Sequence, residues 1–296
     1  MGIEDVALLD VDHVLHGSSI TEDRVSAALA ALADATTFGL HLVNVLDDDT
    51  LAVEGITENA SLYESDDLDH LVQSLSGSIA IDITGLEHRV WAPMVAAFVR
   101  TDTNLLVLYA EPQDYNRSDE LPGNVYDLST TKGIAPLPGF ARLSRRGARG
   151  HFVPLLGFEG ARLEHILDQE DVDIPQTTPV IGSPGFRIEY PMYTYLANHS
   201  MLSLDHMERR VELARASCPF EAFEALERIH AQLGGNLRVA PIGTKPHSLG
   251  AILYALKNPT TTELIYDNPK RSKGRTTGAG SFYAYEISNY LRYRDL

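Results

Sequence analysis

The chain has 296 residues, of which 44% are hydrophobic and 22% are charged, as is usual for a soluble globular protein. The formal net charge of −17 argues against broad binding to duplex nucleic acid or to a membrane surface. No apolar run approaches the roughly 20 residues that span a bilayer, and the acidic N-terminus is unlike a signal peptide. A single cysteine, Cys218, excludes an internal disulfide framework. These features predict a cytoplasmic protein.

Apolar runs and helical patterns alternate along the first part of the chain. The predicted order is strand 5–11, helix from Thr21 to about Ala35, strand 40–46, helix 64–75, strand 78–84, helix 88–99 and strand 104–112. Such alternation is typical of parallel α/β architecture. A composition change near residue 75 predicts an N-terminal α/β unit (1–75) and a core domain (76–296).

The second part of the chain repeats this alternation. The predicted elements are strand 151–158, helix 159–169, strand 178–186, an aromatic-rich loop 189–199, amphipathic helix 219–234, a strand and helix within 239–258, strand 262–269 and a closing edge strand 281–293. The predicted fold class is therefore α/β and Rossmann-like, with a mainly parallel sheet and helices on both faces.

Two pairs of segments resemble each other. Residues 82–112 and 241–269 both place a glycine at a strand-to-helix turn, a histidine at the helix start and Tyr-x-x-Pro after the next strand. The segments 155–166 and 180–191 share Gly-x-x-Gly-x-Arg after a strand.

These patterns give four turns that leave a strand and enter a helix, at 84–88, 157–162, 182–187 and 243–247. If their strands share one parallel sheet, all four turns lie at its carboxyl rim, where ligands bind in such folds. Glycine permits close backbone approach, helix N-termini offer N–H donors, and arginine and lysine attract anions. We therefore predict a site for a small anionic ligand such as a nucleotide, without a metal or a cofactor. The predicted site residues are Thr84, Gly85, His88, Gly157, Gly160, Arg162, Gly182, Gly185, Arg187, Gly243, Thr244, Lys245 and His247. Each turn taken singly is equally compatible with a purely structural role.

The stretch APIGTKPHSLGAILYAL (240–256) resembles the turn motif of the CRISPR-associated Rossmann-fold sensor domains, in which a strand leads through Gly-Thr-Lys into a helix. The resemblance implies that Gly243, Thr244 and Lys245 contact a ligand phosphate or ribose, with Thr84 and Gly85 in the other characteristic turn. It also implies a cyclic oligonucleotide ligand, a homodimer, an effector partner and a role in bacterial defence. The chain departs from the family pattern at Ile242 and at Pro246-His247.

Two other classes of function stay open at this stage. Asp10-Val11-Asp12 resembles the first motif of the haloacid-dehalogenase phosphatases, although the expected second and third motifs are absent. A slow nuclease is also compatible with the residues, because Thr, Lys and a base such as His247 or His88 could position a 2′-hydroxyl for attack. The third alternative is a structural or adaptor subunit that binds no nucleotide.

Overall fold

The computed structural model describes residues 9–18, 22–34, 37–115, 126–127, 133–141, 150–271 and 276–294. The chain divides into two compact units. Unit 1 consists of Met1–Asn116 and Lys273–Leu296, and unit 2 consists of Arg117–Ser272. Each unit has its own mainly parallel sheet with helices around it, so the Rossmann-like α/β fold class is confirmed. The single sheet expected from the sequence is replaced by two.

Unit 1 is built on a seven-stranded sheet with the order β15-β6-β5-β1-β2-β3-β4. The elements of unit 1 are β1 (His13–Gly17), α1 (Asp23–Asp34), β2 (Gly39–Val45), β3 (Thr50–Val53), β4 (Ala60–Ser61), α2 (Ser65–Gln73), β5 (Ile79–Asp82), α3 (His88–Arg100), β6 (Leu105–Tyr115), β15 (Thr276–Glu286) and α9 (Ile287–Tyr293). The four strands β2, β1, β5 and β6 run parallel, and β3, β4 and β15 pair antiparallel at the two edges.

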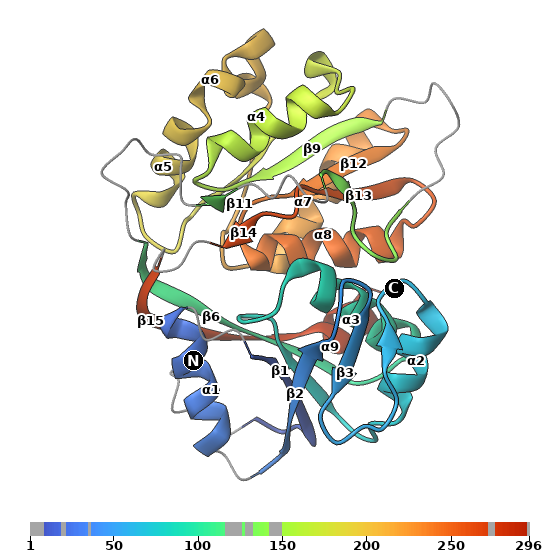
Figure 1. Cartoon of the computed structure of the whole chain (residues 1–296). Coiled ribbons are helices and arrows are strands. Elements are labelled where there is room, and N and C mark those ends of the chain that lie inside the picture. The colour runs from blue at the N-terminus through green and yellow to red at the C-terminus, as the bar shows by residue number, and fades with distance from the viewer. Residues whose placement is uncertain are drawn as a thin grey trace. The chain divides into compact units, whose positions relative to one another are not determined.

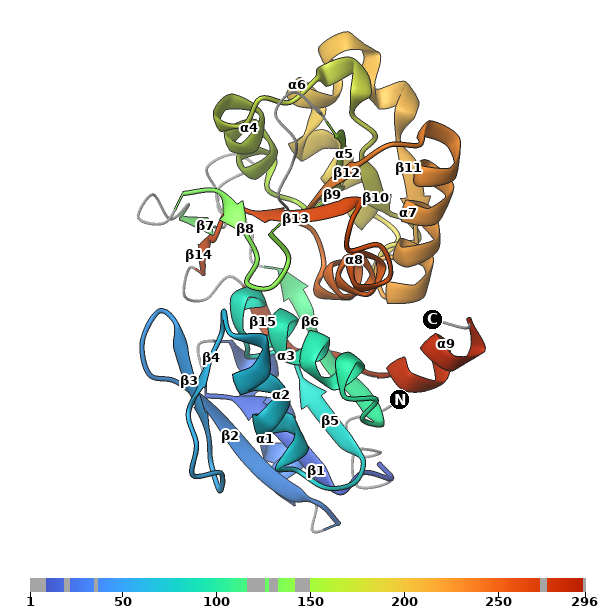
Figure 2. The same cartoon turned by 90° about the vertical axis from the view of Figure 1, so that its right-hand side faces the viewer.

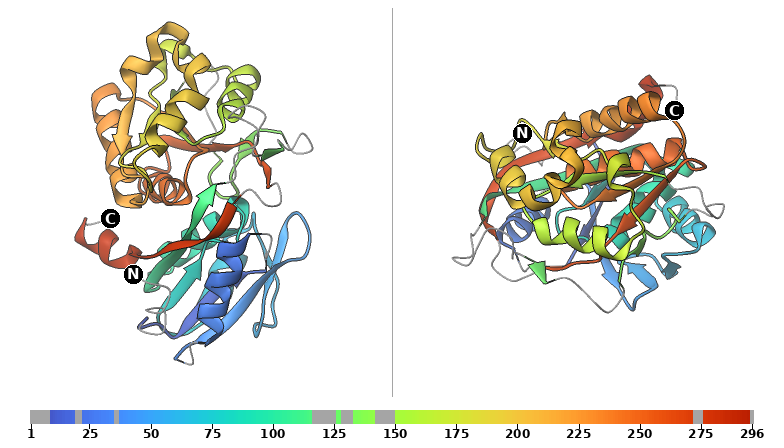
Figure 3. Two further views of the ribbon diagram at one scale, coloured as in Figure 1. Left: turned by 90° about the vertical axis from the view of Figure 1, so that its left-hand side faces the viewer. Right: turned by 90° about the horizontal axis from the view of Figure 1, so that it is seen from above.

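Helix α1 covers one face of this sheet because its apolar residues recur at helical spacing. Val25, Ala28 and Leu32 are buried, and the last two join Val14 and Phe282 in one core cluster. Figure 3 shows α1, in blue, lying against the strands of unit 1. Helices α2 and α3 pack together on the other face (Figure 1).

The sequence-based boundary after residue 75 falls inside unit 1. The strands β5 and β6, which follow that boundary, pair with β1 in the same sheet. The chain also returns to unit 1 at its end, where β15 is an edge strand antiparallel to β6. The predicted edge strand 281–293 is thus correct up to Glu286, after which the chain forms α9.

Unit 2 contains a six-stranded sheet with the order β11-β10-β9-β12-β13-β8 and a two-stranded ribbon of β14 and β7. The elements of unit 2 are β7 (Tyr126–Asp127), β8 (Ala135–Pro136), β9 (His151–Leu156), α4 (Gly160–Gln169), η2 (Ile174–Gln176), β10 (Val180–Gly182), α5 (Tyr190–Ala197), α6 (His199–Leu202), η3 (Leu204–Arg210), β11 (Glu212–Ala214), α7 (Pro219–Leu233), β12 (Leu237–Pro241), α8 (Lys245–Lys257), β13 (Thr262–Tyr266) and β14 (Lys270–Arg271).

The helices of unit 2 form a layer on each face of its sheet. Figures 1 and 2 show α4, α5 and α6 on one face and α7 and α8 on the other. Phe152, Leu163, Ile166 and Leu202 belong to one core cluster between the strands and the first layer. Gly250 lets α8 pack closely on α7, because a Cβ atom there would lie 2.2 Å from the Pro219 carbonyl oxygen. This architecture leaves the strand-to-helix turns at the carboxyl edge of the sheet.

Two element predictions are wrong. The first strand begins at His13, so residues 9–11 of the predicted strand 5–11 precede it, and residues 5–8 lie outside the described residues. The aromatic-rich segment 189–199 contains helix α5 instead of a loop. Across the part of the chain that the structure describes, every helix is too short or too polar to cross a membrane.

Candidate functional site at the carboxyl edge of unit 2

In unit 2, the strand order places the carboxyl ends of β9 and β12 side by side. The chain runs from β9 outwards to β10 and β11, and then returns to the other side of β9 with β12 and β13. Helices α4 and α8 begin just after β9 and β12 and lie on opposite faces of the sheet (Figures 1 and 2). In open parallel sheets, ligands bind in the crevice where the strand order reverses. The two turns at this point therefore form the centre of the candidate site.

Three of the four expected turns lie at this edge. The turns 157–162, 182–187 and 243–247 follow β9, β10 and β12, which pair in parallel. The turn 84–88 follows β5, in the separate sheet of unit 1. The expectation that all four turns share one rim is therefore wrong, because β5 pairs with β1 and β6 and not with the strands of unit 2.

Gly157 and Gly243 bring the two central turns into direct contact. A Cβ atom on Gly157 would lie 3.2 Å from the Gly243 Cα atom. A Cβ atom on Gly243 would lie only 2.7 Å from the Leu156 carbonyl oxygen, which is closer than real Cβ atoms approach backbone. Both positions therefore need glycine for packing, and the backbones of the two turns meet where the strand order reverses.

The turn after β10 contacts two other segments of the same edge. A Cβ atom on Gly182 would lie 2.9 Å from the Ala216 Cβ atom and 3.7 Å from Cε1 of His247. Gly160 and Gly185 have packing reasons of their own. A side chain at Gly160 would meet the Ala197 carbonyl oxygen at 1.8 Å, and one at Gly185 would meet its own turn.

Thr244 ends the turn and caps helix α8. Its extended backbone is that of an N-cap residue, and its Oγ1 atom accepts a hydrogen bond from the His247 backbone N–H. The same hydroxyl donates to the Ala216 carbonyl oxygen at 2.8 Å. The Thr244 hydroxyl therefore fixes the start of α8 against the connection between β11 and α7.

Lys245 is the first residue of α8, and only 6% of its surface is exposed. Pro246 follows at the second position, where a helix does not need a backbone N–H. The N-terminus of a helix carries a partial positive charge, so a lysine at this position is at the end of the dipole that favours anions. Cations stabilise a helix at its other end, where Lys257 lies.

His247 is fully buried in the first turn of α8. Its Nε2 atom lies 3.0 Å from the Arg215 carbonyl oxygen, which can only accept a hydrogen bond, so Nε2 carries the proton. Burial lowers the pKa of His247, and the nearby carbonyls of Arg215 and Ala214 oppose this effect only in part. The imidazole is therefore neutral at pH 7, with Nδ1 as an acceptor. Among the described residues, Nδ1 has no hydrogen-bond partner.

Asn198, on the other face of the sheet, also has a buried acceptor atom without a partner among the described residues. The sequence analysis does not identify this residue. Its Nδ2 group donates to the carbonyl oxygens of Gly157 and Thr194, at 2.9 Å and 2.8 Å. These bonds fix the orientation of the amide and leave Oδ1 as the acceptor. This Oδ1 atom is buried and has no hydrogen-bond partner within the part of the chain that is described. A helix C-cap gives no sequence signal for such a contact.

Arg162 does not present its guanidinium to a ligand. It is 4% exposed, and two of its nitrogens bind the carboxylate of Asp267 at 2.7 Å and 2.5 Å. A third nitrogen donates to the Ile242 carbonyl oxygen at 2.9 Å, and Glu159 lies 3.6 Å away. Arg162 thus ties the turn after β12 to the end of β13. This geometry differs from the expected role of gripping an anion.

The buried cluster around Arg162 holds two carboxyl groups for one cation. Burial raises the pKa of Glu159 to about 8; Arg162 opposes this shift and Asp267 adds to it. Glu159 directly precedes α4 and so lies at one of the two central turns.

Arg187, unlike Arg162, is exposed. It follows β10, and its guanidinium carbon lies 6.0 Å from the centre of the Tyr190 ring.

The predicted residues of unit 1 lie in a buried turn. Thr84 is fully buried; its hydroxyl donates to Asp82 and accepts from the Ala110 backbone N–H at 2.9 Å. A Cβ atom on Gly85 would lie 3.0 Å from Cγ1 of Val25. His88 is the first residue of α3 and is 8% exposed. The hydroxyl of Thr84 therefore joins β5 to β6.

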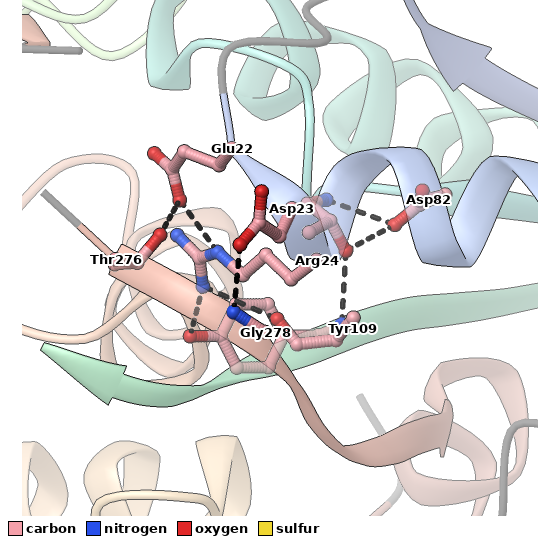
Figure 4. A network of polar contacts seen from close by, with 9 residues as sticks. Glu22, Asp23, Arg24, Asp82, Tyr109, Thr276 and Gly278 are labelled. Atoms are coloured by element: carbon pink, nitrogen blue, oxygen red, sulfur yellow. Dashed lines mark hydrogen bonds and ion pairs between the residues drawn. The ribbon is translucent and has the colours of Figure 1, made fainter. Parts of the chain in front are cut away.

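A buried arginine lies close to this turn (Figure 4). Arg24 binds the carboxylate of Glu22 at 2.7 Å and donates to the Tyr109 hydroxyl at 2.9 Å. Thr276, in β15, donates to the same carboxylate, and the Gly278 N–H donates to Asp23. The network joins the start of α1 to β15 and β6. Arg24 and Glu22 were not identified from the sequence, because their partners are far away in the chain.

The phosphatase motif is not placed for catalysis. Asp10 and Asp12 precede β1 and so lie towards its amino end, away from the carboxyl edge where such an enzyme holds its nucleophile. Asp12 accepts hydrogen bonds from the backbone N–H and the hydroxyl of Ser78. No group of three or more potential metal-ligating side chains is found in the described ranges.

The two sheets, with the reversal of strand order at the β9–β12 junction, define a Rossmann-like α/β protein with a candidate ligand site in its second unit. No protein-family model matches the sequence. A comparison with curated proteins also gives no match.

Proposed function

We propose that unit 2 binds a small phosphorylated ligand, such as a nucleotide, between the turns after β9 and β12. The observation that carries this proposal is the position of Lys245. It is a nearly buried cation in the first turn of α8, beside the point where the strand order of the sheet reverses.

The surroundings of Lys245 suit an anion. Gly243 lets the turn pack closely against the end of β9 just before Lys245, and the N-terminus of α8 adds a partial positive charge. An anionic group bound here would interact favourably with both the ammonium and the helix dipole. Such a local positive site is what a protein with a net charge of −17 needs to hold a phosphate.

Gly243-Thr244-Lys245 resembles the turn motif of the CRISPR-associated sensor domains, and this resemblance supports a particular ligand and a biological role. On that basis, we propose a cyclic oligonucleotide as the ligand, a homodimer as the binding form and a partner effector protein in a cytoplasmic defence system. Arg187 and Gly182 complete the edge on the β10 side in this proposal.

A thermal-shift screen tests the proposal. Inorganic phosphate and mono-, di- and cyclic nucleotides are added to the purified protein, because a ligand at about 100 times its Kd adds about 2.7 kcal/mol of stability. The affinity for each stabilising compound is then measured for Lys245→Met, and we expect a loss of at least about tenfold, or about 1.4 kcal/mol.

Lys257→Met is the matched control, because this lysine lies in the last turn of the same helix and pairs with Glu227 at the surface. It should bind as the wild type does. The melting temperature of each unliganded variant shows that it folds. The proposal is wrong if no compound stabilises the wild type, or if Lys245→Met and Lys257→Met bind equally well.

A further inference from the structure

Two buried polar atoms at this edge, His247 Nδ1 and Asn198 Oδ1, have no hydrogen-bond partner among the described residues, and both are acceptors. His247 has its proton on Nε2, where the Arg215 carbonyl accepts it, and so Nδ1 offers a lone pair. Asn198 has both donors engaged, and so Oδ1 is the unsatisfied atom. A buried acceptor without a donor costs free energy comparable to a lost hydrogen bond. A phosphate oxygen is itself an acceptor, and therefore cannot satisfy either atom.

The ring of His247 lies among segments that all belong to the candidate site. It is in the first turn of α8, two residues after Lys245, and its backbone N–H bonds to the cap hydroxyl of Thr244. Its Nε2 edge contacts Arg215 and its Cε1 atom lies beside Gly182. Asn198 contacts the site from the other side, through the Gly157 carbonyl.

We propose that the phosphorylated ligand carries hydroxyl groups, as a ribose phosphate or a nucleotide does, and that Nδ1 of His247 accepts a hydrogen bond from one of them. This inference rests on the proposed function and narrows its ligand class. Asn198 Oδ1 is the acceptor for a second donor group. His247 is then the residue that distinguishes a phosphorylated sugar from phosphate alone.

The proposed ligand class follows from the chemistry of Lys245 and His247. Lys245 and the start of α8 attract an anion, whereas His247, two residues further along the same helix, requires a donor. A site built to bond a hydroxyl discriminates strongly against the analogue without it, because its buried acceptor is then left unsatisfied. The neutral state of the imidazole keeps this acceptor available at pH 7.

Binding of paired probes to the wild-type protein tests the inference first. Isothermal titration compares ribose 5-phosphate with methyl phosphate, and adenosine 5′-monophosphate with its 2′,3′-dideoxy analogue. We expect the hydroxylated member of each pair to bind at least about tenfold more tightly, or by about 1.4 kcal/mol.

Two variants assign this preference to one atom. In His247→Asn, the side-chain oxygen lies near the position of Nδ1 and keeps an acceptor there. In His247→Gln, the amide nitrogen can donate to the Arg215 carbonyl in place of Nε2, while the Nδ1 acceptor is lost. We expect the preference for hydroxylated probes to persist in His247→Asn and to disappear in His247→Gln. His88→Gln, in the corresponding helix of unit 1, is the control and should leave it unchanged.

The outcomes separate the two proposals. Equal affinity of the wild type for both members of each pair overturns the inference and leaves phosphate binding intact. A preference that survives in folded His247→Gln overturns the role of His247. If no phosphorylated probe binds, the proposed function fails and this inference fails with it. The wild-type comparison decides the ligand class even where a variant does not fold.

Discussion

The two units use the same buried arrangement, in the same place in their folds. In each unit, the first strand of the parallel part of the sheet, β1 or β9, leads to a helix whose first turn carries a buried arginine, Arg24 in unit 1 and Arg162 in unit 2. Each arginine pairs with the glutamate that precedes its helix. Each guanidinium carbon also lies 5.5 Å from the centre of a tyrosine ring, Tyr109 or Tyr266.

Those tyrosines belong to the two chain segments that resemble each other in sequence. The segments 82–112 and 241–269 form β5-α3-β6 in unit 1 and β12-α8-β13 in unit 2. The first strand of each segment lies directly beside the first parallel strand of its unit, β5 beside β1 and β12 beside β9, at the reversal of strand order. The sequence similarity therefore reflects equivalent structural positions.

The difference lies in what each unit places at that reversal. In unit 1, a Cβ atom on Gly17 would lie 2.8 Å from the side chain of Leu86, and Thr84 is bonded to Asp82 and Ala110. In unit 2, the equivalent turn has Gly243 and is followed by the buried Lys245. Both turns make internal contacts, but only the turn of unit 2 is followed directly by a nearly buried lysine. This difference is the reason why we propose unit 2, and not unit 1, as the binding unit.

Replacement of the two arginines is expected to have the largest effect. Arg162→Met leaves the carboxylate of Asp267 buried without its cation, and Arg24→Met leaves Glu22 in the same position. Removal of one partner of a buried ion pair costs about 3–5 kcal/mol. Urea unfolding of each variant measures the loss. If only one variant is destabilised, the two arrangements are not energetically equivalent.

The pH dependence of stability sharpens the comparison, because Arg162 has ion-pair contacts with two carboxyl groups, whereas Arg24 has one such contact among the described residues. Burial raises the pKa of Glu159 from 4.5 to about 8, so the folded protein holds a proton that the unfolded chain releases. The unfolding free energy should fall as the pH rises from about 4.5 to about 8, by at most about 1.4 kcal/mol per pH unit from this group, and the fall should end above that range.

Glu159→Gln keeps the shape of the side chain and removes the titration. Its unfolding free energy, measured by urea at a series of pH values, should lack this part of the slope. If the variant and the wild type have parallel pH profiles, Glu159 does not bind the extra proton of the folded state.

Corresponding glycines in the two turns should differ in their tolerance of a side chain. In Gly243→Ala the new Cβ atom meets the Leu156 carbonyl oxygen at 2.7 Å, and backbone cannot move aside easily. In Gly85→Ala it meets the side chain of Val25 at 3.0 Å, which can shift. We expect Gly243→Ala to cost about 1–3 kcal/mol and Gly85→Ala to cost less. Thermal unfolding ranks the two variants, and the reverse order would contradict this account of the turns.

Local sequence patterns were sufficient for the elements around the site. Helix α3 was predicted at 88–99 and forms at His88–Arg100, and the Gly-Thr-Lys-Pro stretch marked the start of α8. The helical spacing of apolar residues, and the residues that start and end helices, carry this information. The sequence predicts the strand at 5–11 instead of β1 because residues 6–11 are mostly apolar. Helix α5 was taken for a loop because its aromatic and exposed apolar residues, such as Met192 and Leu196, give no clear periodicity.

The pairing of strands and the partners of buried charges could not be predicted. Arg162 and Asp267 are 105 residues apart, and Arg24 and Tyr109 are 85 residues apart. Their contacts depend on which strands are neighbours in each sheet, and a local pattern carries no information on that choice. For the same reason, Arg162 was read as an anion ligand, and the turn at Thr84 was assigned to the same rim as Gly243.

Isothermal titration with adenosine 5′-monophosphate and the other stabilising phosphorylated compounds tests most directly that unit 2, and not unit 1, binds the ligand. The measurement compares wild type with Lys245→Met and with Arg89→Met, which removes the cation in the first turn of the equivalent helix α3. We predict a binding isotherm that weakens by at least about tenfold in Lys245→Met and is unchanged in Arg89→Met. Loss of binding in Arg89→Met with full binding in Lys245→Met would place the site in unit 1 and contradict the account.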